Sequence, residues 1–191
     1  MPRAVSRSLF DTLRLLRSPH GWHELAHEWR RGRAGVPALP PRPIARVLVV
    51  CHGNICRSPF AAAYLSNRIP ELEVRSSGLA AGAAWPADPT AVRVAARHGL
   101  DLSQHHSRPL APADLNEPDL VLVMEAAQAA AFRARAPALA ERVYVLGDFL
   151  TAPPFGIADP FGCSEAVFER TFAQIVAALD QLSLRLKERA T

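Results

Sequence analysis

The residues of this chain best suited to chemistry are a cysteine and an arginine with five residues between them, Cys51 and Arg57. A cysteine thiolate is a strong nucleophile, and the planar guanidinium group of an arginine can donate two parallel hydrogen bonds to phosphoryl oxygens. The loop that joins them contains Gly53. This spacing predicts transfer of a phosphoryl group to sulfur.

The segments on either side of this loop are suited to hold it. Residues 47–50 are aliphatic without polar alternation, which is typical of a strand buried on both faces of a parallel sheet. Ser58, Pro59 and Phe60 then begin an alanine-rich helical segment, with the proline in its first turn. A strand, a loop and a helix N-terminus in this order direct backbone N–H groups and the positive end of the helix dipole inward. We therefore expect an anion-binding loop that favours the thiolate of Cys51.

A second group is needed, because the phenolic oxygen of an aryl phosphate leaves phosphorus more easily when it receives a proton. Asp159 is a candidate acid, since it lies in a proline- and glycine-containing turn, residues 157–162, after the last predicted strand. A lone Asp-Pro pair is also typical of a purely structural turn. The residues alone leave both interpretations open.

The segment VCHGNICRSP, residues 50–59, resembles the signature of the low-molecular-weight protein tyrosine phosphatases. The resemblance implies that Cys51 is the nucleophile, that Arg57 binds phosphate, that Asn54 braces the loop and that Ser58 donates to the thiolate. The phosphate-binding residues implied in this way are His52, Gly53, Asn54, Ile55, Cys56 and Ser58.

The resemblance covers about residues 46–188 and assigns the acid to Asp159, with Phe161 in place of the tyrosine of the family's Asp-Pro-Tyr loop. In a second step the same carboxylate is expected to activate water against a phosphocysteine. Asp88 and His105 are implied to buttress the asparagine and serine of the loop, although as isolated residues they are also typical of a helix N-cap and a surface imidazole.

The activity implied by this resemblance is hydrolysis of aryl phosphate monoesters through a phosphocysteine, without a cofactor. Its substrate would be a phosphotyrosine protein. The loop between Gly78 and Asp88 resembles bacterial, exopolysaccharide-associated members more than eukaryotic ones. A bacterial tyrosine kinase of polysaccharide export is therefore the expected partner.

The rest of the chain alternates strand and helix patterns, which predicts an α/β fold with an open four-stranded parallel sheet and helices on both faces, a flavodoxin-like phosphatase fold. Cys51 would end the first strand, where such sheets bind ligands. The expected strands cover residues 47–50, 72–76, 119–124 and 142–146, and the expected helices cover 58–69, 89–98, 125–136 and 164–188.

Length and composition predict one catalytic domain, residues 44–191, with a basic extension, residues 1–43. The net charge is +4, but the extension carries eight arginines against three acidic residues, so the remainder is near −1 and no nucleic-acid partner is expected. The seven histidines and three cysteines show no metal-site spacing, which predicts no metal and reduced thiols. No signal or spanning segment is apparent, so we expect a cytoplasmic protein.

The extension contains two short amphipathic patterns, residues 9–16 and 22–29, separated by residues 18–21 and followed by a proline-rich linker, residues 36–43. The apolar stripe of the second pattern, which includes Trp22 and Trp29, is interpreted either as packing on the catalytic domain or as docking on an anionic membrane surface or a partner. Deletion of residues 1–43 is expected to leave activity on a small aryl phosphate almost intact, whereas an insoluble or inactive truncated protein would indicate that the stripe completes the core of the catalytic domain.

Two other functions fit parts of the pattern. An arsenate reductase of the same fold also uses such a loop but relays oxidation to further cysteines, and residues 78–110 contain none, which leaves only Cys56 and Cys163. A non-catalytic phosphate-binding docking module is the other alternative. The presence of Cys51, Arg57 and Asp159 together favours an enzyme over such a module.

Overall fold

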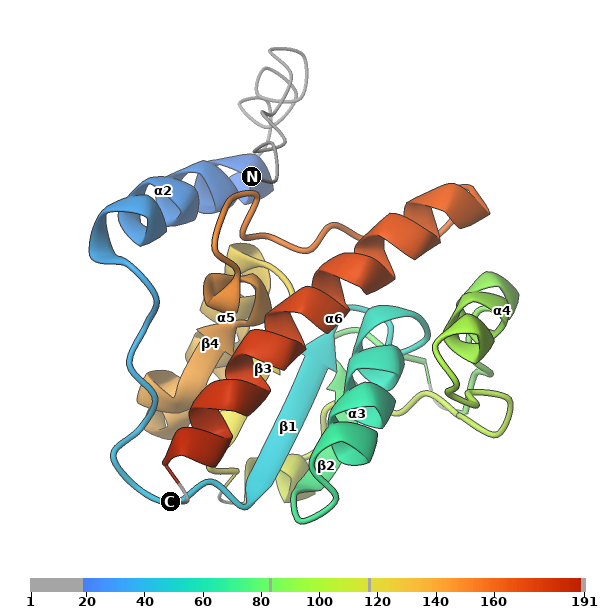
Figure 1. Ribbon diagram of the computed structural model, residues 1–191, viewed down its shortest axis with the longest axis horizontal. Helices are drawn as coiled ribbons and strands as arrows, with labels where there is room; N and C mark the ends of the chain where they lie inside the picture. Colours follow the sequence, from blue (N-terminus) through green and yellow to red (C-terminus); the bar gives the residue numbers. More distant parts are fainter. Residues whose placement is uncertain (1–18, 83, 117, 190–191) are drawn as a thin grey trace.

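The computed structural model of the protein describes residues 19–189 except 83 and 117, and its centre is a four-stranded sheet (Figure 1). All neighbouring strands are parallel, in the order β2-β1-β3-β4, as the alternating pattern predicts. The strands are β1 (Arg46–Cys51), β2 (Glu73–Gly78), β3 (Leu120–Val123) and β4 (Val143–Val145).

Helices cover both faces of the sheet, and each expected helix is present within one or two residues. One face is covered by α3 (Arg57–Arg68) and α6 (Glu165–Glu188), against which α4 (Pro89–Arg97) packs, and the other by α5 (Ala126–Arg135). The described residues also form three short 3-10 helices: η1 (Pro112–Leu115), η2 (Pro137–Arg142) and η3 (Leu146–Phe149).

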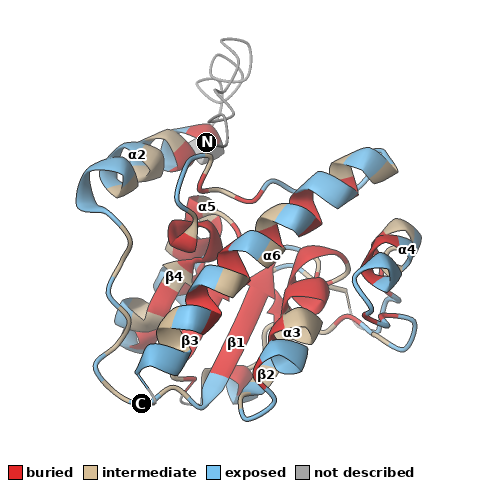
Figure 2. Ribbon diagram, in the orientation of Figure 1, coloured by how far each residue is buried: buried red, intermediate tan, exposed pale blue. Residues whose placement is uncertain are grey.

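The central strand β1 is buried on both faces, which explains its unbroken aliphatic sequence (Figure 2). Val47 and Val49 belong to the core beneath α3 and α6, whereas Leu48 and Val50 belong to the core beneath α5. Successive side chains of a strand point to opposite faces, so every position after the exposed Arg46 must be apolar.

The strand order places the end of β1 at a switch point, because β1 is followed by β2 on one side while β3 pairs with it on the other. Cys51 lies at that carboxyl end, in register with Gly78 of β2. A β-carbon at position 78 would lie 2.7 Å from the carbonyl oxygen of His52. Only glycine therefore lets β2 end against the loop that follows β1.

Helix α2 (Pro19–Ala34) is the described helix of the extension, and it packs beside α5. It begins at Pro19, so residues 19–21 form its first turn and do not break the helix. The expectation that the tryptophan stripe packs on the catalytic domain is wrong, because Trp22 and Trp29 are 58% and 66% exposed. The face that meets the domain is polar instead. The other predicted amphipathic segment, residues 9–16, lies outside the described part of the chain.

The proline-rich linker runs along the catalytic domain. Val36 and Leu39 pack at the edge of the core, and the Tyr144 hydroxyl donates to the carbonyl of Ala38 at 3.0 Å. Among the described helices, none combines the length and apolar character needed to cross a membrane.

Candidate active site

The sulfur of Cys51 is enclosed by the loop that the chain forms between β1 and α3. The residue is 2% exposed, and its Sγ receives the backbone N–H of Asn54 at 3.3 Å. The hydroxyl of Ser58 lies 3.0 Å from the same sulfur. Two donors thus converge on one buried sulfur, the arrangement that stabilises a thiolate.

Asn54 holds the loop in shape from its centre. Its φ of 54° is left-handed, a conformation that asparagine tolerates better than most residues. Its side-chain amide donates to the hydroxyls of Ser58 at 2.9 Å and Ser76 at 3.0 Å, and its side-chain oxygen accepts from the backbone N–H of Arg108 at 3.0 Å. Since the Ser58 oxygen already accepts one bond, its own hydrogen can point to the Cys51 sulfur.

His105 supports the same loop from outside. Its Nε2 lies 2.8 Å from the carbonyl oxygen of Asn54. Burial lowers the pKa of His105, so the ring is neutral at pH 7 and donates through Nε2–H. This contact fits the buttressing role that the family resemblance implies.

Asp88 supports the loop in a different way from the one expected. Its carboxylate accepts from the backbone N–H groups of Thr90 at 2.7 Å and Ala91 at 3.2 Å, so it is the N-cap of α4. Its own backbone N–H donates to the carbonyl of Ile55 at 2.9 Å. The backbone of Asp88 therefore contacts the loop while its side chain fixes the adjacent helix.

Arg57 is the first residue of α3 and is only 1% exposed. Its guanidinium donates to the carbonyl of Ile157 at 2.9 Å and to the carboxylate of Asp159 at 2.5 Å, and it pairs with Glu125 at 3.3 Å. The buried Nε has no hydrogen-bond partner among the described residues. A buried donor of this kind suits an acceptor that a bound anion supplies.

Asp159 reaches the loop from the segment that precedes α6. Its side chain is 42% exposed, and its second carboxylate oxygen accepts the backbone N–H of Phe161 at 3.2 Å. Phe161 is itself 62% exposed. The structure thus brings Cys51, Arg57 and Asp159 together, as the sequence predicts, with an aromatic ring beside the carboxylate in the chain.

A cavity of about 480 Å³ opens between these groups and α5. Arg57 and Asp159 form part of its wall, together with His52, and α5 contributes Ala127 and Ala131. The two alanines make one wall apolar, opposite the charged groups. An aryl ring could lie on this wall while its phosphate reaches the loop.

The two cysteines of the loop have different chemistry. Cys56 is 3% exposed, and burial, followed by the negative charges of Asp88 and Asp159, raises the pKa of its thiol. It therefore stays protonated at neutral pH. Cys163, the remaining cysteine, is exposed and belongs to the segment before α6. Cys51 is thus the cysteine of the loop whose sulfur is contacted by the Asn54 N–H and the Ser58 hydroxyl.

Three residues of the site were not predicted from the sequence. Ser76 and Arg108 hold the Asn54 side chain, and the Arg108 guanidinium in turn bonds the Ser76 carbonyl at 2.8 Å. Glu125 follows β3 directly and pairs with Arg57. An acidic residue immediately after a buried strand is the signal that could have identified it, since that strand ends at the edge where Cys51 lies.

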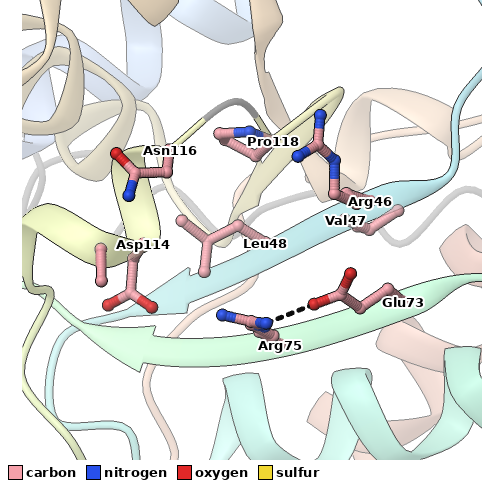
Figure 3. A pocket seen from close by; sticks show the side chains of 9 residues that line it. Arg46, Val47, Leu48, Glu73, Arg75, Asp114, Asn116 and Pro118 are labelled. Atoms are coloured by element: carbon pink, nitrogen blue, oxygen red, sulfur yellow. Dashed lines mark ion pairs between the residues drawn. The ribbon is translucent and has the colours of Figure 1, made fainter.

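A second cavity, of about 300 Å³, lies at the other end of the sheet (Figure 3). It is lined by the first residues of β1 and β2 and by η1, with an ion pair between Glu73 and Arg75 at 2.5 Å. It contains none of the predicted site residues, and so the candidate site is the one at Cys51.

Comparisons with known proteins identify similar families and relatives. The family model described as low molecular weight phosphotyrosine protein phosphatase matches residues 46–191. The probable low molecular weight protein-tyrosine-phosphatase EpsP of Ralstonia nicotianae is 40% identical over 75% of this chain and 97% of its own length.

Solved structures of phosphatases share this fold. The Erwinia amylovora tyrosine phosphatase amsI is 31% identical, with a TM-score of 0.71 over 75% of this chain and 94% of that one. The YwlE arginine phosphatase of Geobacillus stearothermophilus is also 31% identical, with a TM-score of 0.71 over 76% and 94%. One fold thus carries phosphatases that are named for two different phosphorylated residues.

The role of Asn54 can be tested with two substitutions. Asn54→Ala and Asn54→Gly both remove the side-chain hydrogen bonds, each worth about 1 kcal/mol. Alanine is also strained at a positive φ, so Asn54→Ala should be less stable than Asn54→Gly by about 1 kcal/mol. Urea unfolding of the three proteins measures this order. Equal stability of the two variants would contradict a strained loop.

Proposed function

The chain belongs to the low molecular weight phosphotyrosine protein phosphatase family, and we propose that Cys51, Arg57 and Asp159 carry out its reaction. The family's activity is hydrolysis of phosphotyrosine through a phosphocysteine. The observation that carries the assignment is the bond between Arg57 and Asp159, because it holds the candidate acid at 2.5 Å from the candidate phosphate-binding group. Both groups adjoin the loop that encloses Cys51.

In the first step the Cys51 thiolate attacks phosphorus and the bond to the phenolic oxygen breaks. Asp159, in its protonated form, transfers a proton to that oxygen as it leaves. The loop N–H groups and Arg57 bind the equatorial phosphoryl oxygens, and the Ser58 hydroxyl stabilises the sulfur. A phosphocysteine and a neutral phenol result.

In the second step a water molecule attacks the phosphocysteine and the phosphorus–sulfur bond breaks. Asp159, now ionised, accepts a proton from that water. The products are inorganic phosphate and the Cys51 thiolate, which Asn54 N–H and Ser58 stabilise again. Each group returns to its starting protonation state, with the Asp159 proton replaced from water.

The substrate we propose is a phosphotyrosine protein, and more narrowly a bacterial tyrosine kinase of polysaccharide export. The apolar wall of Ala127 and Ala131 supports an aryl substituent, and Phe161 provides an exposed ring near the acid. The arsenate-reductase alternative loses support because Cys56 is buried and neutral, so it is poorly suited to resolve an oxidised Cys51. The intact constellation argues equally against a non-catalytic docking module.

We further propose that the outer face of α2 docks on an anionic lipid surface. Trp22 and Trp29 are seven residues apart on the helix and both are exposed, and the guanidinium of Arg33 lies 5.0 Å from the Trp29 ring. Arg30 is exposed nearby. Aromatic rings flanked by arginines suit the boundary between headgroups and acyl chains. The excess of five positive charges in residues 1–43 complements an anionic surface.

Replacement of the nucleophile tests the catalytic assignment. Cys51→Ser should hydrolyse p-nitrophenyl phosphate at under about 1% of the wild-type rate, because a serine hydroxyl is not ionised at neutral pH. It should still bind inorganic phosphate in calorimetry. Cys163→Ser, which changes an exposed cysteine, is the matched control and should keep full activity. Substantial hydrolysis by pure Cys51→Ser would refute the mechanism.

The same assay separates substrate classes. Phosphotyrosine and phosphoarginine peptides of identical sequence are compared with the wild-type protein, and phosphotyrosine should have the higher kcat/KM. The reverse order would contradict the proposed substrate but not the role of Cys51, because both reactions need a nucleophile.

The role of Asp159 is tested with leaving groups of different basicity. Asp159→Asn keeps the shape but cannot transfer a proton, so kcat/KM for phenyl phosphate should fall by about 10²–10⁴-fold. An ester of the far more acidic 2,4-dinitrophenol should lose much less. An equal loss on both esters would mean that the proton comes from another group.

Docking of α2 is tested by co-sedimentation with phosphatidylglycerol vesicles. Trp22→Ala/Trp29→Ala should bind less, and binding of the wild type should weaken as salt rises, because each arginine near the surface contributes about 1 kcal/mol of screened attraction. Trp85→Ala removes a tryptophan that is 57% exposed elsewhere and should bind as the wild type does. Unchanged binding of the double variant, or equal binding to neutral phosphatidylcholine vesicles, would exclude this surface.

A further inference from the structure

The inner face of α2 contacts the segment that carries the candidate acid. In Figure 1 the helix lies next to α5 and to the orange segment that precedes α6. The Arg31 guanidinium donates to the carbonyl of Asp148 at 2.7 and 2.9 Å and to that of Leu150 at 3.0 Å. It also lies 4.6 Å from the centre of the Phe155 ring, and His27 bonds the Asp148 carboxylate at 2.7 Å.

Glu24 connects α2 to α5 and to the segment that carries Asp159. It is only 4% exposed, and its carboxylate accepts the backbone N–H of Ala127 at 3.1 Å. Ala127 lies in the first turn of α5, where a negative charge is favoured, and it lines the active-site cavity. A β-carbon on Gly156 would lie 2.4 Å from the other oxygen of Glu24, so this carboxylate also rests against the acid segment.

The contacts continue from this segment to the reacting groups. Gly156 is followed by Ile157, whose N–H donates to the Met124 carbonyl at 2.8 Å and whose own carbonyl accepts from Arg57. Asp159 follows two residues later. A displacement of the segment at Gly156 would therefore move both the acid and a ligand of the phosphate-binding arginine.

The segment is held by its contacts with other elements, among them the buried side chains of Phe155 and Ile157. Residues 150–163 form no helix or strand, and they need external contacts to hold one geometry. On the α6 side Gln174 donates to the carbonyl of Pro154 at 2.8 Å. On the opposite side the contacts come from α2. The helix is therefore a second support of a segment that must place one carboxylate accurately.

We propose that Glu24 and Arg31 are positioning residues for the phosphatase reaction, which hold Asp159 where it can protonate the leaving group. The extension is then a working part of the active site, contrary to the expectation that its deletion spares catalysis. This inference rests on the proposed role of Asp159 as the acid. Neither residue of α2 touches the substrate.

The test compares kcat/KM for a good and a poor leaving group in the full-length protein. Glu24→Ala and Arg31→Ala should lose about tenfold more activity on phenyl phosphate than on 2,4-dinitrophenyl phosphate, because misplacement of the acid affects only the ester that needs a proton. The ratio of the two values is taken within one sample. It therefore does not depend on the fraction of protein that is folded.

Matched variants separate a role in placing Asp159 from a general effect on the fold. Glu24→Gln keeps an oxygen that can accept from Ala127 and should restore a ratio near that of the wild type. Arg33→Ala changes the opposite face of α2 and should leave the ratio unchanged. Equal losses on both esters in Glu24→Ala and Arg31→Ala would overturn the proposal, since the helix would then act on the fold or on Arg57 and not on the acid.

Asp159→Asn, measured with the same pair of esters, separates this inference from the proposed function. If Asp159→Asn shifts the ratio and the α2 variants do not, the positioning role fails while the acid assignment stands. If Asp159→Asn leaves the ratio unchanged, the acid assignment fails and the positioning role fails with it.

Discussion

The need to stabilise the buried guanidinium of Arg57 governs the arrangement of the active site. A cation at 1% exposure has lost its hydration and must be compensated by acceptors within the protein. They come from two distant segments, Glu125 at the start of α5 and Ile157 with Asp159 before α6. One charge thus holds three parts of the chain at a single point. The same charge is what a phosphate dianion would bind.

The loop around Cys51 is held by a different kind of interaction. Its support is almost entirely neutral hydrogen bonding centred on Asn54, with His105 kept uncharged by burial. Neutral support has an advantage here. A further fixed charge beside the sulfur would change both the stability of the thiolate and the affinity for phosphate. The site therefore combines a neutral frame with one buried cation.

The sequence predicts the sheet and its central motif well because their causes are local. A short unbroken run of mostly β-branched residues favours a strand buried on both faces, and residues 47–50 form such a strand. Ser76, Arg108 and Glu125 could not be assigned in the same way, since their roles depend on which strand ends lie side by side. The packing of the tryptophan stripe of α2 on the catalytic domain was wrongly predicted for a related reason. A helix that packs on exposed carbonyls and a helix N-terminus buries its polar face, which periodicity alone assigns to solvent.

The contacts of α2 join residues far apart in the sequence, so they cannot form until most of the chain has been synthesised. His27 and Asp148 are 121 positions apart, so the helix leaves the ribosome long before its partner exists. Contacts of such long range form after local ones, because the entropy of closing the loop must be met first. The nascent helix therefore emerges with both its tryptophan face and its glutamate–arginine face uncovered, and it meets its docking site only after the strands of the sheet have been made.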